Sequence, residues 1–257
     1  MKRKTIQDIK NLKKSKLPFA TLTAYDFHSA QIIDSADIPL ILVGDSASMT
    51  MYGYDTTIPI SMEEMLLVVR AVSRAAKQAL VVADMPFLSY QTSIEDTIKN
   101  AGTLIKNGGA GAVKLEGGLQ VKKHIQTLVD YGIPVLGHVG LTPQSYHQLS
   151  GYKIQGKTPE EAQRIINDAK AVENAGAFGV VLECIPEILA KEITQQLTIP
   201  TIGIGSGNNC DGQIQVFHDI IGLSREKAPK HAQTYDNIYS KIQNIVTQYK
   251  SDVENSS

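Results

Sequence analysis

The sequence predicts an α/β fold, a single (β/α)₈ TIM barrel with a short N-terminal helix. Short runs rich in Val, Ile and Leu alternate with longer segments of helical periodicity along the whole chain. Most of these runs are continuous rather than alternating, which is typical of parallel strands covered on both faces. Because about eight strand–helix units follow one another without a break in composition, one barrel is favoured over an open sheet. We therefore expect residues 1–257 to form one domain.

The expected elements follow from these runs and from the helical spacing between them. Strands are expected at 19–25, 39–45, 79–85, 111–116, 133–138, 178–183, 199–204 and 214–221. Helices are expected at 27–36, 62–77, 94–107, 119–131, 159–175, 186–197 and 235–249. Helix-end signals agree with this division. Thr158, Pro159 and Glu160 form a typical helix start, and Gly132 and Gly176 follow periodic stretches.

The two ends of the chain have distinct compositions. Residues 1–16 are basic, with Ile6, Ile9 and Leu12 at helical spacing. This segment is either an arm for a membrane or RNA, or a helix that covers the amino end of the barrel with its lysines in water. The second interpretation is favoured. Residues 251–257 (SDVENSS) are expected to be a frayed tail.

The overall composition restricts the function classes. The 257 residues are 42% hydrophobic and carry a formal net charge of −1, so neither nucleic acid nor an anionic membrane is an expected partner. No apolar run approaches the roughly 18 residues that a membrane span needs. Cys184 and Cys210 form no CxxC pair and no disulfide framework. We expect a cytoplasmic protein.

Three carboxylates stand where apolar runs stop. Asp45, Asp84 and Glu116 occur in the segments LILVGDS, LVVADMP and AVKLEGG, each at the point where the apolar run stops. The carboxyl ends of parallel strands meet on one face of a barrel, and that face holds the active sites of such barrels. Hard oxygen ligands from separate strands suit a divalent cation such as Mg²⁺, with positions left for substrate.

Further polar groups are expected on the same face. They are Asp26, Ser46, Lys114, His138, Glu183 and the glycine-rich segment GIGSG at 203–207. Each also has a plain structural interpretation, since strand-end Asp and Ser often cap helices and Lys114 can simply pair with Glu116. Several carboxylates near one Lys and one His are costly without a cation or proton to hold them, which favours a catalytic site.

The candidate roles follow from the chemistry of each group. The carboxylates would bind a metal whose open positions accept a chelating substrate such as a 2-oxo acid. Lys114 would pair with the substrate carboxylate or with negative charge on its oxo group. Glu183 follows the apolar run FGVVL, and a partly desolvated carboxylate suits a general base. His138 is either an active-site group or a hydrogen-bonded structural residue. The GIGSG segment either binds phosphate or lets the backbone approach a ligand.

Seven segments together resemble the ketopantoate hydroxymethyltransferase family. They are VGDSASMTMYGYDTTIPIS, VVADMPFLSY, AVKLEGG, GHVGLTPQS, GYKIQGKT, VLECIP and GIGSGNNCDGQIQVFHDIIG, in the family's order between about residues 5 and 225. The resemblance implies a (β/α)₈ barrel that transfers the one-carbon unit of 5,10-methylenetetrahydrofolate to 3-methyl-2-oxobutanoate. The product would be 2-dehydropantoate, in pantothenate biosynthesis. A large homo-oligomer, commonly a decamer, is also implied.

The resemblance also implies site residues. Mg²⁺ ligands match Asp45, Asp84 and Glu116, and the 2-oxo acid contacts match Asp45, Ser46, Asp84 and Lys114. Glu183 matches the proton acceptor that would form a metal-stabilised enolate, and His138 matches the active-site wall.

The chain departs from the family pattern at a few positions. Ala47-Ser48 replaces the usual Leu-Gly, Leu67-Val68 replaces a Tyr-His pair, and Ser206 replaces Ala in the glycine-rich segment. The Ser48 change matters if that position needs a positive φ. Two alternatives stay open: a Mg²⁺-dependent 2-oxo acid aldolase or lyase, and a catalytically weak homologue that acts as a binding subunit.

Overall fold

The computed structural model describes residues 2–224 and 229–256, and it contains a closed barrel of eight parallel strands in chain order. This confirms the predicted (β/α)₈ fold. The strands are β1 (Phe19–Thr23), β2 (Leu40–Val43), β3 (Leu80–Asp84), β4 (Ala112–Glu116), β5 (Val135–Gly140), β6 (Gly179–Glu183), β7 (Thr201–Ile204) and β8 (Gly212–Gln215). Their register brings Glu116 opposite His138, and Glu183 lies opposite Gly140, two residues closer to the carboxyl end of the barrel than His138.

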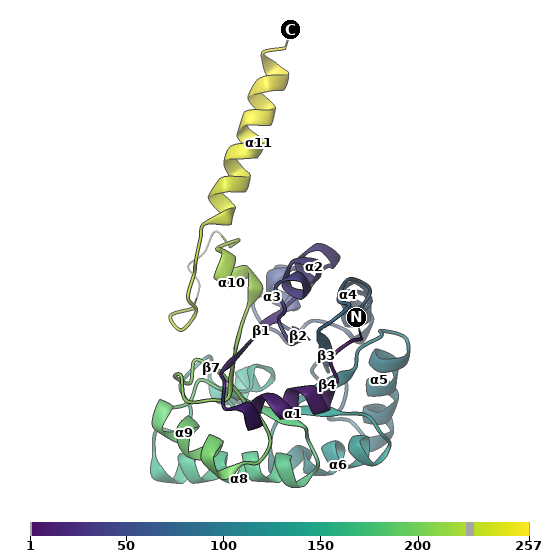
Figure 1. Cartoon of the computed structure of the whole chain (residues 1–257), viewed down its shortest axis with the longest axis vertical. Helices are drawn as coiled ribbons and strands as arrows, with labels where there is room; N and C mark the ends of the chain where they lie inside the picture. The colour runs from purple at the N-terminus through teal and green to yellow at the C-terminus, as the bar shows by residue number, and fades with distance from the viewer. Residues whose placement is uncertain (1, 225–228, 257) are drawn as a thin grey trace. The chain divides into compact units, whose positions relative to one another are not determined.

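Helices follow the strands and lie outside the barrel, as Figure 1 shows. They are α2 (Phe27–Ser35), α3 (Ala47–Thr50), α4 (Met62–Ala75), α5 (Ile94–Lys106), α6 (Lys122–Asp130), α7 (Tyr146–Leu149), α8 (Pro159–Asn174) and α9 (Glu187–Gln196), with 3₁₀ turns η1 (Leu119–Val121) and η2 (Pro143–Ser145). The expected start of α8 is confirmed, since Thr158 and Glu161 form a reciprocal capping box.

The position predicted for the eighth strand was wrong. β8 pairs with β7 through Ile202–Gly212 and Gly203–Gln213, so it begins before the expected 214–221. Residues Phe217–Ile221 form the helix α10 instead. Apolar residues at 217, 220 and 221 have helical spacing, and a run this short does not distinguish strand from helix. The short helices α3 and α7 were not expected either.

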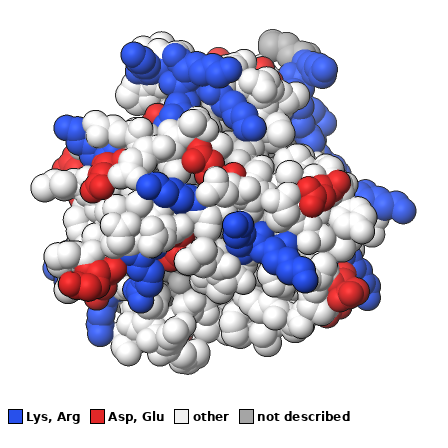
Figure 2. Space-filling view, turned by 90° about the horizontal axis from the view of Figure 1, so that it is seen from below, with Lys and Arg blue, Asp and Glu red and all other residues white. Residues whose placement is uncertain are grey.

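The N-terminal helix α1 (Ile6–Ser15) covers the amino end of the barrel, as expected. Ile9 is fully buried in a core cluster with residues that begin strands, among them Leu40 and Leu80, and Ile6 and Leu12 pack against this cluster. The apolar face of α1 is thus buried against the amino end of the barrel. Figure 2 shows basic side chains gathered along one edge of the visible face and mixed charges over the rest.

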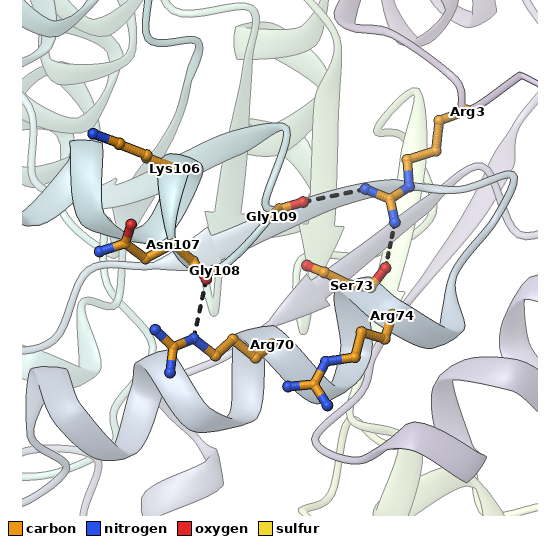
Figure 3. A pocket seen from close by; sticks show the side chains of 8 residues that line it. All are labelled: Arg3, Arg70, Ser73, Arg74, Lys106, Asn107, Gly108 and Gly109. Atoms are coloured by element: carbon orange, nitrogen blue, oxygen red, sulfur yellow. Dashed lines mark hydrogen bonds between the residues drawn. The ribbon is translucent and has the colours of Figure 1, made fainter.

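Arg3 fastens the N-terminal segment to the ends of two helices. Its guanidinium donates hydrogen bonds to the carbonyls of Ser73, of Ala76 (2.7 Å from Nη2) and of Gly109 (3.1 Å from Nη1), as Figure 3 shows in part. Arg70 likewise donates to the Asn107 carbonyl at 3.0 Å. These carbonyls lie in or just after the last turns of α4 and α5, where cations are favoured by the helix dipole. The basic lining of the cavity drawn there, about 340 Å³ in volume, therefore has a structural explanation.

The chain divides into two compact units, Met1–Ile214 and Gln215–Ser257. The second contains α10 and α11 (Ile238–Glu254), joined by hydrogen bonds such as that from the Tyr235 N–H to the Ile220 carbonyl at 2.8 Å. Helix α11 runs to Glu254, into the segment 251–257 expected to fray; Ser257 lies outside the described residues. None of the residues of α11 is buried. Over residues 2–224 and 229–256, the helices include none with the length and apolar character that a membrane span requires.

Candidate active site

The three predicted metal-ligating carboxylates lie together at the carboxyl end of the barrel. Asp84 and Glu116 are the last residues of β3 and β4, and Asp45 follows β2 by two residues. All three are at least 94% buried. The Asp45 N–H donates a hydrogen bond to Asp84 Oδ2 at 3.0 Å, which fixes the two strand ends to each other.

Lys114 supplies the positive charge among these carboxylates. It lies on β4 two residues before Glu116, so the two side chains share the inner face of the strand. Its ammonium group forms an ion pair with Asp84 and lies 3.7 Å from Glu116 Oε1. Burial alone would lower the pKa of Lys114, but the charges of Asp84, Glu116 and Asp45 raise it above its usual range. The surrounding carboxylates therefore favour the charged form of Lys114.

The negative charge of the site is only partly compensated. Burial and the charge of Asp84 raise the pKa of Asp45, and burial raises the pKa of Glu116 well above its usual range despite Lys114. Burial is the main cause of both shifts, and like charge among the carboxylates adds to it. A cation placed among these three carboxylates would favour their ionised forms.

Gln144 connects carboxylates from different strands, and sequence reasoning missed it. Its side-chain Nε2 donates to Asp45 Oδ2 at 3.0 Å and to the Met85 carbonyl at 2.9 Å. Its backbone N–H donates to Glu116 Oε2 at 3.0 Å. The Tyr90 hydroxyl donates to Gln144 Oε1 at 2.8 Å, which orients the amide. The only sequence signal was its place in GLTPQS, directly after a candidate site strand.

His138 and Glu183 lie side by side at the ends of β5 and β6. His138 Nε2 is 3.3 Å from Glu183 Oε2, and His138 Nδ1 is 3.5 Å from Glu116 Oε1. Neither ring nitrogen makes a well-formed hydrogen bond to a described residue. The Glu183 side chain is 16% exposed, whereas that of Glu116 is 3% exposed. Glu183 is thus the more accessible carboxylate of the two that flank His138.

Ser46 lies beside the same carboxylates, and Asp26 does not need a catalytic role. The Ser46 hydroxyl is 2.7 Å from the hydroxyl of the buried Tyr25, a second residue that sequence reasoning missed. Asp26 is the N-cap of α2, and its carboxylate accepts hydrogen bonds from the N–H groups of His28 and Ser29. The structural interpretation of Asp26 therefore suffices.

The glycine-rich segment and the residue that follows it form hydrogen bonds within the protein. The Ser206 hydroxyl donates to the Leu182 carbonyl at 2.8 Å, and the Asn208 N–H donates to Glu187 Oε1 at 3.3 Å. The Glu187 carboxylate thus places a negative charge beside the end of this loop, which disfavours phosphate there. The other interpretation, close approach of the backbone to a ligand, stays a prediction.

The two cysteines have no features of nucleophiles. Burial, and next the charge of Glu183, raises the pKa of Cys184 to about 12, and burial raises that of Cys210 to about 11. Both thiols therefore stay protonated near neutral pH.

The donor chemistry fits a hard divalent cation. The site offers buried carboxylate oxygens from three strands and has a deficit of positive charge. Within the described ranges, however, no three Asp, Glu, His or Cys side chains form a ready-made metal cluster. Lys114 bridges Asp84 and Glu116 instead, and Gln144 donates hydrogen bonds to both Asp45 and Glu116.

Comparison with known proteins identifies the family of the chain. The family model described as ketopantoate hydroxymethyltransferase matches residues 3–257. The chain belongs to this family. A relative from Geobacter metallireducens named 3-methyl-2-oxobutanoate hydroxymethyltransferase is 51% identical over 98% of the chain and 95% of its own length. A relative of the same name from Carboxydothermus hydrogenoformans is 50% identical over 99% of the chain and 92% of its own length. A member of the ketopantoate hydroxymethyltransferase family is an enzyme of the transferase class.

Solved structures support the fold alone. Phosphonopyruvate hydrolase matches with a TM-score of 0.67 at 14% identity over 98% of this chain and 88% of that one. A complex of phosphonopyruvate hydrolase with oxalate and Mg²⁺ matches with a TM-score of 0.67 at 13% identity, over 97% and 88%. A 2,3-dimethylmalate lyase of the PEP mutase/isocitrate lyase superfamily matches with a TM-score of 0.62 at 14% identity, over 96% of this chain and 88% of that one.

The departures from the family pattern are accommodated locally. Ser48 lies inside α3, is fully buried and is absent from the positive-φ positions, so it needs no glycine there. Its hydroxyl donates to the Thr56 carbonyl at 2.7 Å and thereby closes the loop after β2. Leu67 is 62% exposed on α4 and Val68 is buried. Both belong to a helix, whereas the carboxylates lie at the ends of strands.

Proposed function

We propose that the protein transfers a hydroxymethyl group from 5,10-methylenetetrahydrofolate to 3-methyl-2-oxobutanoate and gives 2-dehydropantoate. The observation that carries the proposal is the pairing of a buried carboxylate cluster with a more accessible carboxylate, Glu183, beside His138. The names of the relatives support 3-methyl-2-oxobutanoate as the acceptor substrate, and the folate donor is part of the proposal. One water molecule is consumed, and tetrahydrofolate is released.

We assign Asp45, Asp84 and Glu116 as the Mg²⁺ ligands, and Asp45, Ser46, Asp84 and Lys114 as the contacts of the keto acid. Bound Mg²⁺ would polarise the 2-oxo group and stabilise negative charge on its oxygen. Lys114 is buried and its charged form is favoured by the carboxylates around it, so it would pair with the carboxylate of the substrate or with charge that develops on the oxo group.

Glu183 is assigned as the base that accepts the C3 proton of the keto acid. The enolate carbon would then form a bond to the methylene carbon of the folate, and water would supply the hydroxyl group. Both bonds from that carbon to the folate nitrogens break, and the nitrogens take up the C3 proton and one proton of the water. His138 lies within 3.5 Å of both Glu183 and Glu116 and would orient Glu183 or hold the proton that it receives.

The proposal includes a cytoplasmic homo-oligomer, with small-molecule substrates and with neither nucleic acid nor membrane as a partner. Helix α11 supports self-association, because Ile242, Ile245 and Tyr249 are exposed on it at spacings of three and four residues. Size-exclusion chromatography with light scattering tests the expected decamer.

The deciding experiment follows the C3 proton of 3-methyl-2-oxobutanoate by NMR in D₂O, with protein and Mg²⁺, with and without methylenetetrahydrofolate. Metal-dependent loss of the signal, then 2-dehydropantoate only with folate, is expected. Exchange without folate-dependent product would point to an aldolase or lyase. A folded protein without any exchange would point to a non-catalytic homologue, which the complete carboxylate set opposes.

A further inference from the structure

Exposed apolar side chains gather on loops that follow the barrel strands. Met49 and Tyr52 follow β2, Phe87 and Leu88 follow β3, and Tyr152 follows β5; each is between 36% and 55% exposed. These loops lie at the carboxyl end of the barrel, the same end as Asp84 and Glu116. A soluble barrel has no structural need to expose large apolar groups around its catalytic face, so they are candidates for ligand contacts.

Tyr152 holds a special place among them because it reaches across the barrel mouth. Its hydroxyl donates to Met49 Sδ at 3.8 Å, and Met49 belongs to α3, the helix that begins directly after Ser46. Strands β2 and β5 are not neighbours, since β3 and β4 stand between them. A contact between their loops therefore passes over the strand ends that carry Asp84 and Glu116.

The electrostatic surroundings of Tyr152 agree with this position. After burial, the charges of Asp45, Glu183 and Glu116 are among the causes that raise the pKa of its phenol to about 12. Both the predicted metal ligands and the predicted base thus act on this one ring. Tyr146 packs against it from the same loop, with ring centroids 5.2 Å apart and ring planes at 58°.

The geometry points to Tyr152, with Tyr146 and Met49, as the contact site for the planar ring of the one-carbon donor. This inference rests on the proposed function, which requires a second substrate beside the keto acid. The enolate carbon must meet the methylene carbon of the donor, so the fused ring of the donor has to lie at the mouth above the carboxylates. A flat heteroaromatic ring is bound well by tyrosine faces and by a thioether.

The two chemical steps separate the roles of this cluster. Exchange of the C3 proton needs the keto acid and Mg²⁺ only, whereas product formation also needs the folate. Tyr152→Ala should therefore raise the KM for methylenetetrahydrofolate about tenfold or more, while the exchange rate and the KM for the keto acid stay near those of the wild type. Tyr152→Phe keeps the ring and should retain a KM close to that of the wild type.

Tyr131→Ala is the matched control. Tyr131 is 71% exposed at the end of α6, on a helix that runs back toward the amino end of the barrel, and its loss should change neither step. Equal loss of exchange and transfer in Tyr152→Ala would overturn the inference and place Tyr152 at the keto acid. An unchanged KM for the folate would also overturn it. A wild-type protein that shows no exchange would instead overturn the proposed function.

Discussion

His138 Nε2 lies 3.3 Å from Glu183 Oε2, and Glu116 faces the other ring nitrogen of the same histidine at 3.5 Å. One imidazole thus separates the carboxylate assigned as base from a carboxylate assigned to the metal. Glu116 ends β4 and Glu183 ends β6, so the proposed metal ligand and the proposed base belong to different strands.

Glu183→Gln should abolish exchange of the C3 proton while the keto acid and metal still bind. The amide keeps the shape of the side chain but cannot accept a proton, and loss of a positioned base costs about 10² to 10⁴ in rate. NMR exchange in D₂O measures the first effect, and calorimetric titration of the keto acid with Mg²⁺ measures the second. Retained exchange would remove Glu183 from the role of base.

Asp84→Ala should weaken Mg²⁺ binding sharply. The variant loses a predicted ligand and leaves Lys114 with Glu116 as its remaining ion-pair partner, so the site becomes less negative. Titration with Mn²⁺, followed by electron paramagnetic resonance, reports the affinity without reference to turnover. Asp96→Ala, on the exposed first turn of α5, serves as the control. An unchanged titration for the Asp84 variant would refute its assignment as a ligand.

Gln144→Leu should lower both stability and metal affinity. The substitution removes the Gln144 donor from Asp45 Oδ2, and an unpaired buried group costs about 1–3 kcal/mol. The Tyr90 hydroxyl loses Gln144 as an acceptor but keeps the Glu116 carbonyl. Thermal unfolding and Mn²⁺ titration measure the two effects. Gln126→Leu is the matched control, because its amide reaches only the exposed Asp130. If both readings for the Gln144 variant equal those of the wild type, the network does not hold the carboxylates.

The strand ends made the carboxylate cluster predictable from the sequence. Parallel strands bring their last residues to one level, so Asp84 and Glu116 had to be close once β3 and β4 were recognised. The fold class was predictable for the same reason, since continuous apolar runs between helical segments admit few other arrangements. The family resemblance then supplied substrates that periodicity alone cannot indicate.

The side-chain network around the cluster was not predictable. Gln144 meets Asp45 across 99 positions of sequence, and nothing periodic marks such a contact. Tyr25, Tyr90 and Tyr152 depend equally on loop conformations that follow the strands. The misplaced β8 has another cause: the apolar residues of Phe217–Ile221 satisfy helical spacing as well as a strand, and pairing with β7 decides between the two.

Asp34 makes part of the stability dependent on pH. Its buried carboxylate accepts hydrogen bonds from the N–H groups of Lys77, Gln78 and Ala79, at 2.8 to 3.0 Å, just before β3. Burial alone would raise the pKa of Asp34, but these bonds outweigh it and lower the pKa. The contribution is therefore full above the unfolded pKa of about 3.9 and is lost as the pH falls through the folded value.

Asp34→Asn should destabilise the protein by about 1–3 kcal/mol at pH 7 and by less at low pH. The amide offers one acceptor oxygen where the carboxylate offers two. Urea unfolding at pH 7 and near pH 3.5 measures the difference, with Asp130→Asn on exposed α6 as the control. A destabilisation that stays constant between the two pH values would contradict the role of the charge.

Arg3→Ala should loosen the attachment of the N-terminal segment and lower the melting temperature. The guanidinium serves carbonyls at the ends of both α4 and α5, and these acceptors would have only water to replace it. A loss of about 1–3 kcal/mol is expected, and in a chain of this size each kcal/mol corresponds to about 2–4 °C. Arg74→Ala removes a cation from the same cavity, where Arg74 makes no hydrogen bond to the described residues, and should leave the melting temperature within about 1 °C. Equal shifts for the two variants would mean that the charge near the helix ends matters and the three carbonyl contacts of Arg3 do not.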